Sequence, residues 1–295
     1  MWRYTMRKTL LGLSLITMAF LSNPLAVQAN DTIYFGVIPL ESQRAMKTKF
    51  TPLAEYLSKE IGKPVEVVVG KDYQSTMDDM GTGKIQIAYL TPTTYPKAEK
   101  QNPDAQIKPL VKFQQNGKAT YFTQIIANPK AGIEKLADIK GKKFAFGSED
   151  STASHLMPRS MLVGAGIDID KDLAEHKFTG SHSNVAQAVT LGSMDAGGVQ
   201  DSVGEKFAAE GKVKIIEKSG EIPQFPICVN KHLSQELQDK IKAAMVKLNA
   251  NNEEHKIILT SIDKKYTGSE EASSADYDII RNMISKLYGD SFYSK

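Results

Sequence analysis

Short apolar runs rich in β-branched residues alternate along the chain with runs whose apolar residues recur every three or four positions. The first kind is typical of strands and the second of helices that bury one face. Phe50, Leu53 and Leu57, for example, have helical spacing. This alternation indicates an α/β fold with mixed, mainly parallel sheets. The strands predicted in the first half of the chain cover residues 33–38, 65–69, 85–90, 107–113, 121–127 and 143–146, with a short polar helix at 133–139.

The second half of the chain continues the pattern and ends in helices. Residues 213–217 and 225–229 are predicted strands, a long helix is expected from Ser234, and a final helix is expected at 275–288. Roughly 265 residues follow the N-terminal segment, with no linker rich in Pro, Gly or Ser between them. That length suits two lobes joined by crossing strands, with the C-terminal helices packed back on the first lobe.

Residues 1–29 have the pattern of a secretory signal peptide. Arg3, Arg7 and Lys8 precede an apolar run of about 12 residues, and small residues end the segment at Ala29. The run is shorter than the ~20 residues that cross a bilayer, which favours a cleaved signal over a retained membrane anchor. We therefore expect an exported protein.

The net charge argues against nucleic acid or an anionic membrane surface as a partner. The chain carries 37 basic and 34 acidic residues, a formal net charge of +3. Without the three basic residues of the predicted signal peptide, 34 basic residues remain against 34 acidic ones, so the rest of the chain is neutral. A surface that binds a polyanion would need an excess of positive charge.

Signals for metals, cofactors and nucleophilic catalysis are weak. The five histidines lack the spacing of metal ligands, and Cys228 is the single cysteine of the chain. The sequence contains neither a G-x-x-x-x-G-K-[ST] loop nor a G-x-S-x-G elbow. Ser151, His182 and Asp201 could still assemble in space as a hydrolase triad, which stays open as a less favoured alternative. We expect no cofactor, no metal and no enzymatic activity.

The segment FAFGSEDSTASHLMPR, residues 144–159, is the most informative part of the sequence. A predicted strand leads through Gly147 to Ser151 and Thr152 at the start of a helix. Hydroxyls at that position lie beside N–H groups without helical partners, and the helix dipole adds positive charge, so an anion can bind without Lys or Arg. An ordinary N-cap explains the same residues. Pro158 is expected to kink or interrupt the helix, which favours a functional role.

Two further polar clusters follow predicted strands. The segment IAYLTPTTY carries Tyr89 and Thr91, and the segment FTGSHSN carries His182 just before a predicted helix. Open α/β sheets bind ligands at the carboxyl ends of their strands, where these side chains would meet the Ser151 turn. A surface histidine is the alternative interpretation of His182. The convergence of three such clusters favours a ligand site.

A fourth cluster, DAGGVQDSV, places Gln200 and Asp201 at another strand end. An acidic side chain repels a fully ionised anion. It becomes useful where the ligand keeps an acidic proton, because the carboxylate then accepts a hydrogen bond that sulfate cannot supply. The alternative is that Asp201 is only the N-cap of a helix.

Six segments, taken in order, resemble the phosphonate-binding periplasmic proteins of bacterial ABC importers, which bind phosphate, phosphite or phosphonate. The segments read FGVIPLESQRAM, IAYLTPTTY, FAFGSEDSTASHLMPR, FTGSHSNVAQAV, DAGGVQDSV and IPQFPICVNK, and they span about residues 32–250. The resemblance implies a monomeric protein with a two-lobed type II periplasmic binding fold, which captures a phosphorus oxyanion and delivers it to permease subunits in the inner membrane. It also implies that lobe 1 covers residues 30–121 and 227–295, and that lobe 2 covers residues 122–226.

The resemblance further implies which residues bind the ligand. The third hydroxyl of the family's Ser-Thr-Ser turn is missing at Ala153, whose N–H can still donate, and Ser154 replaces a frequent glycine. Glu41 is only a candidate for binding an amine on the ligand. The expected ligand-binding residues are Tyr89, Thr91, Ser151, Thr152, Ala153, Ser154, His182, Gln200 and Asp201, with the acidic contact falling on Gln200 or Asp201.

Three alternatives to this function stay open at the level of sequence. The protein could be a receptor for another small anion or an organic solute, a periplasmic phosphoester hydrolase, or a sensory module for a membrane kinase with the same fold. The sequence also leaves open which phosphorus compound is preferred.

Overall fold

The structure, a computed structural model, describes residues 1–2 and 32–294. The chain divides into residues 1–31 and residues 32–295, and the description below concerns the second unit. Residues 3–29 of the expected signal peptide lie outside the described residues. Within the described part, no helix has both the length and the apolar character needed to cross a membrane.

A six-stranded mixed sheet, here called the sheet of lobe 1, has the order β13-β4-β12-β3-β1-β2. Strand β1 runs parallel to β2 and β3, whereas β12 runs antiparallel to β3 and β4, and β13 runs antiparallel to β4. The strands are β1 (Ile33–Val37), β2 (Val65–Val69), β3 (Ile87–Tyr89), β4 (Lys108–Gln115), β12 (Pro226–Val229) and β13 (Tyr266–Glu271).

A five-stranded sheet, here called the sheet of lobe 2, has the order β10-β6-β9-β7-β8. Strand β7 runs parallel to β8 and β9, whereas β6 runs antiparallel to β9 and β10. Its strands are β6 (Thr123–Ala127), β7 (Lys143–Phe146), β8 (Glu175–Phe178), β9 (Ala196–Gln200) and β10 (Lys214–Lys218). The sheets are mixed as expected, but parallel pairing does not dominate, because the strands next to the crossings between the sheets run antiparallel to their neighbours.

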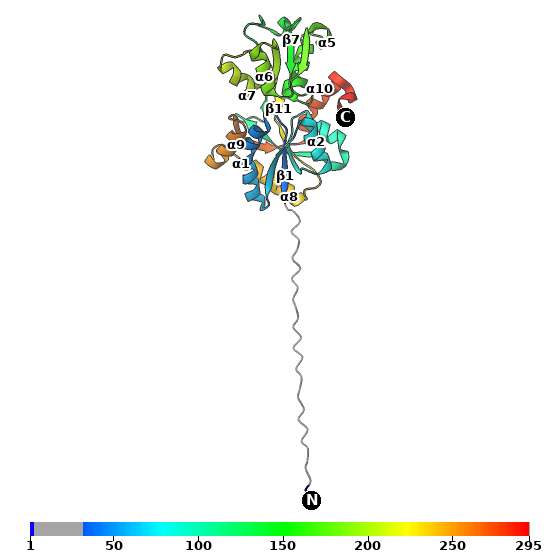
Figure 1. The fold of residues 1–295 in the computed structure, drawn as a ribbon, viewed down its shortest axis with the longest axis vertical. Coiled ribbons are helices and arrows are strands. Elements are labelled where there is room, and N and C mark those ends of the chain that lie inside the picture. Colours follow the sequence, from blue (N-terminus) through cyan, green and yellow to red (C-terminus); the bar gives the residue numbers. More distant parts are fainter. Residues whose placement is uncertain (3–31, 295) are drawn as a thin grey trace. The chain divides into compact units, whose positions relative to one another are not determined.

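Two short strands, β5 (Thr120–Tyr121) and β11 (Ile222–Pro223), pair antiparallel where the chain passes between the sheets. The chain leaves lobe 1 from β4 through β5 and returns through β11 to β12. Figure 1 shows β11 between the two lobes that contain these sheets. This two-stranded connection matches the expected pair of crossing strands.

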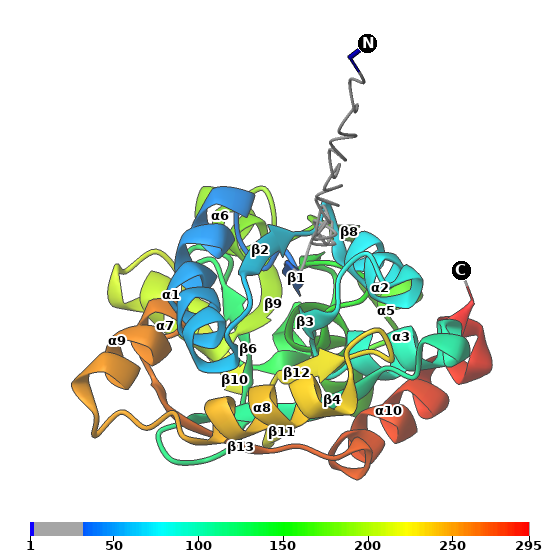
Figure 2. The same ribbon diagram turned by 90° about the horizontal axis from the view of Figure 1, so that it is seen from below.

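Helices cover both sheets, and Figure 2 shows α1 and α9 on one side of the lobe 1 sheet and α2, α3 and α10 on the other. The α-helices of lobe 1 are α1 (Gln43–Ile61), α2 (Tyr73–Thr82), α3 (Thr94–Gln101), α8 (Gln235–Val246), α9 (Glu253–Ile262) and α10 (Asp278–Tyr288). Those of lobe 2 are α4 (Met157–Gly164), α5 (Ile169–Asp172), α6 (His182–Leu191) and α7 (Asp201–Ala209). Short 3₁₀ turns are η1 (Pro103–Ala105), η2 (Leu136–Ile139), η4 (Ser274–Tyr277) and η5 (Gly289–Tyr293), and η3 (Thr152–Leu156) is π-helical.

Most predicted elements lie close to where the sequence placed them, with several differences. The strand expected at 121–127 divides into β5 of the connection and β6 of the lobe 2 sheet, and the final helix expected at 275–288 begins as the 3₁₀ turn η4. The helix expected at 133–139 is only the 3₁₀ turn at 136–139. Strand β13 (Tyr266–Glu271) was not predicted, because its sequence YTGSEE is polar and its place in the sheet comes from pairing with β4.

The largest hydrophobic core lies in lobe 1 and extends into the connection between the lobes. It includes Tyr121 and Phe225 from the crossing segments, and Ala153 and Leu156 from the π-helix η3 of lobe 2. The apolar side of η3 therefore packs against the core of the opposite lobe. Burial of apolar surface fixes the position of this turn, which carries several of the predicted ligand-binding residues.

Candidate functional site

The turn between β7 and α4 begins with a side-chain cap. The Ser151 hydroxyl accepts the backbone N–H of Ser154 at 3.1 Å, and the N–H of Leu156 donates to the Ser151 carbonyl at 3.0 Å. A hydrogen bond from the N–H of a residue to the carbonyl five positions earlier is characteristic of a π-helix, here η3. The first N–H groups of a helix have no partner within it. The turn therefore offers those groups, together with the Ser151 hydroxyl, as donors to an anion.

Pro158 explains why the turn is π-helical. Proline has no N–H, so it cannot bond the carbonyls of the preceding turn. Those carbonyls bind other groups instead: that of Ser154 accepts the N–H of Gly147 at 3.0 Å, and that of Ala153 accepts the hydroxyl of Thr123 at 3.2 Å. The expected interruption of the helix near Pro158 takes this form, and it ties the turn to two strands of lobe 2.

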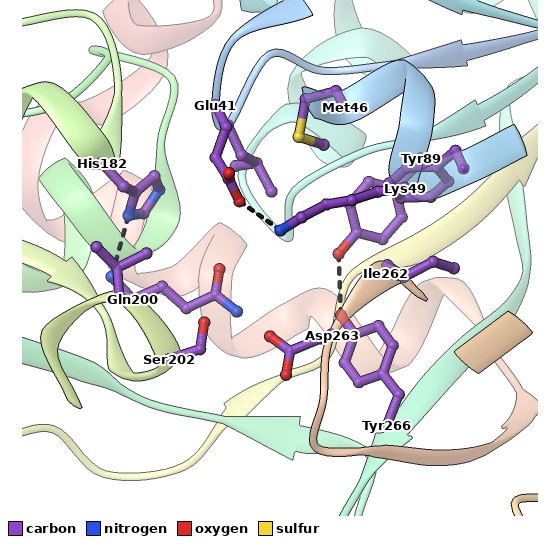
Figure 3. A pocket seen from close by; sticks show the side chains of 13 residues that line it. Glu41, Met46, Lys49, Tyr89, His182, Gln200, Ser202, Ile262, Asp263 and Tyr266 are labelled. Atoms are coloured by element: carbon purple, nitrogen blue, oxygen red, sulfur yellow. Dashed lines mark hydrogen bonds and ion pairs between the residues drawn. The ribbon is translucent and has the colours of Figure 1, made fainter. Parts of the chain in front are cut away.

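His182 lies next to the turn at the start of α6. Its Nε2 atom is 3.3 Å from the Ser151 hydroxyl, and its Nδ1 atom accepts the backbone N–H of Gln200 at 3.0 Å, as Figure 3 shows for the second contact. Since Nδ1 is an acceptor, the proton of the neutral ring is on Nε2. Burial lowers the pKa of His182 to about 4. The ring is therefore a neutral hydrogen-bond donor that points toward Ser151.

Several buried polar atoms around the turn have no hydrogen-bond partner among the described residues. They are the hydroxyls of Tyr73, Tyr121 and Ser154 and the Oδ1 atom of Asp201. Burial raises the pKa of Tyr73 and of Tyr121, an effect that nearby Ser151 and Thr152, respectively, partly offset. Buried polar groups in native proteins are nearly always paired, so this concentration of groups without a partner among the described residues makes the turn the candidate ligand site.

Tyr73 and Tyr121 were not among the predicted site residues. Tyr73 opens α2 behind its N-cap Asp72, and Tyr121 lies on the crossing strand β5. Tyr73 follows the carboxyl end of β2 by four positions, where the rule applied to the other strand ends would have found it, whereas Tyr121 lies within a short strand. The available signal was the position of Tyr121 in the crossing segment, since residues there border both lobes.

Thr91 and Thr152 take part in contacts between the lobes. The Thr91 hydroxyl donates to the carbonyl of Asp150 at 3.3 Å. The hydroxyl of Thr152 accepts the N–H of Thr93 at 2.9 Å and lies 2.8 Å from the Thr93 hydroxyl. Lys97 forms an ion pair with Asp150, and both side chains are buried. These contacts hold the turn against the start of α3, and Thr91 binds the backbone of the turn.

Tyr89, His182 and Gln200 line a pocket, which Figure 3 shows. The Tyr89 hydroxyl lies 3.0 Å from that of Tyr266. Glu41 borders the same pocket and forms an ion pair with Lys49. The carboxylate of Glu41, the candidate for binding an amine, is therefore already paired with a lysine.

Asp201, the first residue of α7, is held on one side only. Its Oδ2 atom accepts the amide N–H of Gln115 at 2.9 Å and lies 3.3 Å from the ammonium of Lys265. Its Oδ1 atom is buried without a partner among the described residues. Burial raises the pKa of Asp201, and the charge of Lys265 opposes that rise.

Each of three lysines near the site is paired with a carboxylate: Lys49 with Glu41, Lys97 with Asp150, and Lys265 with Asp201 and Glu205. Around the Ser151 turn, the groups named above that can meet an anion are neutral hydroxyls, the His182 ring and backbone N–H groups. In the described part of the chain, no group of three or more His, Cys, Asp or Glu side chains could hold a metal ion.

Two α/β lobes joined by two crossing strands define the type II periplasmic binding protein fold. Residues 35–277 match the family described as periplasmic substrate-binding proteins of phosphonate ABC transporters, and the chain belongs to that family. This finding confirms the resemblance that the sequence motifs indicated.

Curated relatives and solved structures agree with this assignment. The chain is 27% identical over 275 residues to the phosphate-import protein PhnD of Mycolicibacterium smegmatis, covering 86% of this chain and 85% of that protein. It is 26% identical over 242 residues to the phosphonates-binding periplasmic protein of Escherichia coli, covering 77% and 70%. PhnD1 of Prochlorococcus marinus in complex with methylphosphonate has the same fold, with a TM-score of 0.79, 22% identity and coverage of 88% and 100%. A binding protein component of an ABC phosphonate transporter from Pseudomonas aeruginosa has a TM-score of 0.78, 22% identity and coverage of 90% and 88%.

Proposed function

We propose that this protein binds a phosphorus oxyanion (phosphite, phosphate or a phosphonate) between its lobes and delivers it to an ABC permease. The relatives named as phosphate-import and phosphonates-binding proteins support this choice of ligand. The observation that carries the proposal is the set of buried, unpaired polar atoms of Tyr73, Tyr121, Ser154 and Asp201 around the Ser151 turn. A tetrahedral anion offers several acceptors to such donors, and a protonated oxygen of the ligand can donate to the carboxylate of Asp201.

The proposed ligand contacts come from both lobes. Ser151, Thr152, Ala153 and His182 act from lobe 2, and Tyr73 acts from lobe 1. Burying an anion is costly unless hydrogen bonds surround it. Charge-assisted hydrogen bonds of about 1.5–3 kcal/mol each can supply micromolar affinity, about −8 kcal/mol, without a lysine or arginine. The lobe limits 30–121, 122–226 and 227–295 belong to this proposal.

The geometry favours binding over hydrolysis. In a serine hydrolase the histidine accepts the serine proton on Nε2 while its Nδ1–H donates to an aspartate. Here Nδ1 of His182 accepts the N–H of Gln200, so Nε2 carries the proton and cannot take another from Ser151 in the neutral ring. Asp201 binds Gln115 and Lys265 instead of His182. We propose that the protein is not an enzyme.

Isothermal titration with phosphite, phosphate, methylphosphonate, aminoethylphosphonate and sulfate tests the proposal. At least one phosphorus compound should bind with micromolar or tighter affinity, and Ser151→Ala and Tyr121→Phe should each weaken it about tenfold or more. Tyr293→Phe, which removes a hydroxyl from the C-terminal turn η5, serves as the control and should bind normally. Heat from none of the phosphorus compounds would refute the proposal, as would turnover of a chromogenic phosphate ester that is lost in Ser151→Ala.

We propose further that residues 1–29 are cleaved during export, and that the protein acts as a periplasmic monomer. Mass spectrometry of the periplasmic fraction should find a chain that begins near Asn30, and gel filtration should give the mass of one chain. Cells that lack the protein should take up the bound phosphorus compound more slowly. If uptake is normal and only transcription responds to the ligand, the protein is a sensory module instead.

A further inference from the structure

Asp201 is buried at a contact between the two lobes. It lies on lobe 2, whereas both groups that bind its Oδ2 atom come from lobe 1: the amide of Gln115 at the end of β4 and the ammonium of Lys265 just before β13. The carbonyl of Lys265 accepts the N–H of Asn116 at 3.0 Å, which fixes its backbone beside Gln115. One edge of lobe 1 therefore presents two donors to a single carboxylate oxygen.

The arrangement leaves the other oxygen of Asp201 free to act. Oδ1 is buried and has no partner among the described residues. The N–H of Asp201 donates to the carbonyl of Phe122 at 3.0 Å, which places Asp201 beside Tyr121. The charge of its carboxylate helps raise the pKa of the Tyr121 hydroxyl, although burial is the larger cause. Tyr121 is one of the unpaired hydroxyls beside the Ser151 turn. Oδ1 and the anion-binding donors thus belong to one cluster.

Lys265 is the largest of the influences that oppose the rise in the pKa of this carboxyl. Burial favours the protonated form of Asp201, and the positive charge 3.3 Å away favours the carboxylate. The charged groups that face Asp201 are Lys265 from lobe 1 and Glu205 from its own helix, and Tyr121 is the nearby titratable hydroxyl. Glu205 also pairs with Lys265, at a shorter distance than Asp201, but its side chain is half exposed whereas that of Asp201 is buried.

The geometry points to Lys265 as a specificity-determining positioning residue: it holds Asp201 as a carboxylate whose Oδ1 accepts a hydrogen bond from the ligand. This inference rests on the proposed function. A carboxylate at that position accepts a hydrogen bond from an oxyanion that carries an acidic proton, and it repels an oxyanion that carries none. Lys265 itself touches no ligand; it acts through Asp201. The preferred ligand is then monoprotonated phosphite, phosphate or phosphonate, and sulfate is rejected.

The test compares phosphite and sulfate in the protein and in Lys265→Met, by isothermal titration at about pH 6 and about pH 8. Without the ammonium, the pKa of buried Asp201 should rise further, which favours its protonated form, a hydrogen-bond donor. Phosphite binding at the lower pH should weaken about ten- to hundredfold, and sulfate binding should stay equal or strengthen. The unmodified protein should bind phosphite more tightly at the lower pH, where phosphite keeps its acidic proton. In Lys265→Met this pH dependence of the phosphite affinity should disappear or reverse. Lys265→Gln keeps a polar side chain without the charge and should give the same loss of selectivity if Lys265→Met does not fold.

Two control variants separate this role from general effects of charge. Lys118→Met removes an exposed lysine paired with Glu221 and should leave both affinities unchanged. Glu205→Gln removes the second partner of Lys265 but keeps its contact with Asp201, so selectivity should persist. In the Asp201→Asn background, Lys265→Met should add no further loss of selectivity, because the two residues act through one carboxylate.

Several outcomes would overturn the inference while the proposed function stands. Equal weakening of phosphite and sulfate in Lys265→Met would show that the lysine only attracts anions or stabilises the contact between lobes. The inference is also refuted if Lys265→Met leaves the ratio of the phosphite and sulfate affinities unchanged. It is refuted as well if Lys265→Met lowers that ratio further in a protein that already carries Asp201→Asn. If the unmodified protein binds no phosphorus oxyanion, the proposed function fails and this inference fails with it.

Discussion

The hydroxyl of Tyr288 lies 2.6 Å from the Nε2 atom of His155, and this contact joins the end of α10 in lobe 1 to the π-helix η3 in lobe 2. The other ring nitrogen of His155 lies 2.6 Å from the carbonyl of Glu149, which can only accept. His155 therefore donates from Nδ1 and accepts the Tyr288 proton at Nε2. The end of the C-terminal helix α10 thus contacts the turn that we propose binds the ligand.

Tyr288→Phe should weaken ligand binding without removing any ligand contact. The variant loses one hydrogen bond between the lobes, worth about 1 kcal/mol, and leaves Nε2 of a buried histidine unpaired. The dissociation constant should rise about fivefold, mainly through faster dissociation. Stopped-flow and titration measurements check this, with Tyr293→Phe as the matched control on the same segment. Unchanged dissociation in Tyr288→Phe would mean that the C-terminal contact does not help hold the lobes together.

Acid should destabilise the protein through its two buried histidines. Burial lowers the pKa of both His155 and His182 to about 4, from 6.5 for a free histidine. The folded state therefore binds fewer protons than the unfolded one, and each histidine's stabilising contribution is complete above about pH 6.5 and is lost as the pH falls to about 4. The expected loss is about 3 kcal/mol for each residue.

Urea unfolding between about pH 7 and pH 4 measures this effect. His155→Gln and His182→Gln should each lose less stability on acidification than the unmodified protein, because one proton uptake is removed. His232→Gln, at an exposed position, should keep the original pH dependence. The same slope in all four proteins would show that carboxyl groups alone cause the acid response.

Gly147 should tolerate no side chain. A Cβ atom there would lie 2.1 Å from the Ser154 hydroxyl and 2.8 Å from its Cβ, so Gly147→Ala must displace the turn. We expect at least tenfold weaker binding and a stability loss of about 1–3 kcal/mol. Gly164→Ala is the control, because no atom lies within 4 Å of the added Cβ. Alanine in place of glycine in a helix should raise the free energy of unfolding by up to about 1 kcal/mol. Titration and thermal unfolding of both variants decide the matter, and normal affinity in Gly147→Ala would contradict the expected role of the turn.

Elements defined by local sequence were predictable, and contacts between distant segments were not. Strands β1, β2 and β7 lie within a residue of their predicted ranges because their apolar runs are bounded by turn residues. The approach of His182 to Ser151 followed from the rule that parallel strands end at one edge.

Thr91 was expected to meet the Ser151 turn, but its particular contact there could not be predicted, because it is a backbone carbonyl 59 positions away. Tyr73 was missed although it follows the carboxyl end of β2, and it lies near Ser151. Similarly, the lysine partner of Asp201 lies on a loop before β13, a strand that the polar sequence did not reveal. Side chains that meet only through tertiary packing leave no periodic signal in the sequence.

Pro158→Ala should convert the π-helical turn toward a regular α-helix and weaken binding. The restored N–H would compete for the carbonyl of Ser154, which now accepts the N–H of Gly147, and the lost ring would leave a gap beside Gly198. We expect affinity to fall about tenfold because the donors of residues 151–153 rotate away from the ligand. Pro52→Ala, in the middle of α1, removes a proline from another helix and should stabilise the protein without changing affinity. A crystal structure of Pro158→Ala shows whether the hydrogen bond from Leu156 to the Ser151 carbonyl remains. If it remains and the affinity is normal, packing rather than the missing N–H shapes the turn.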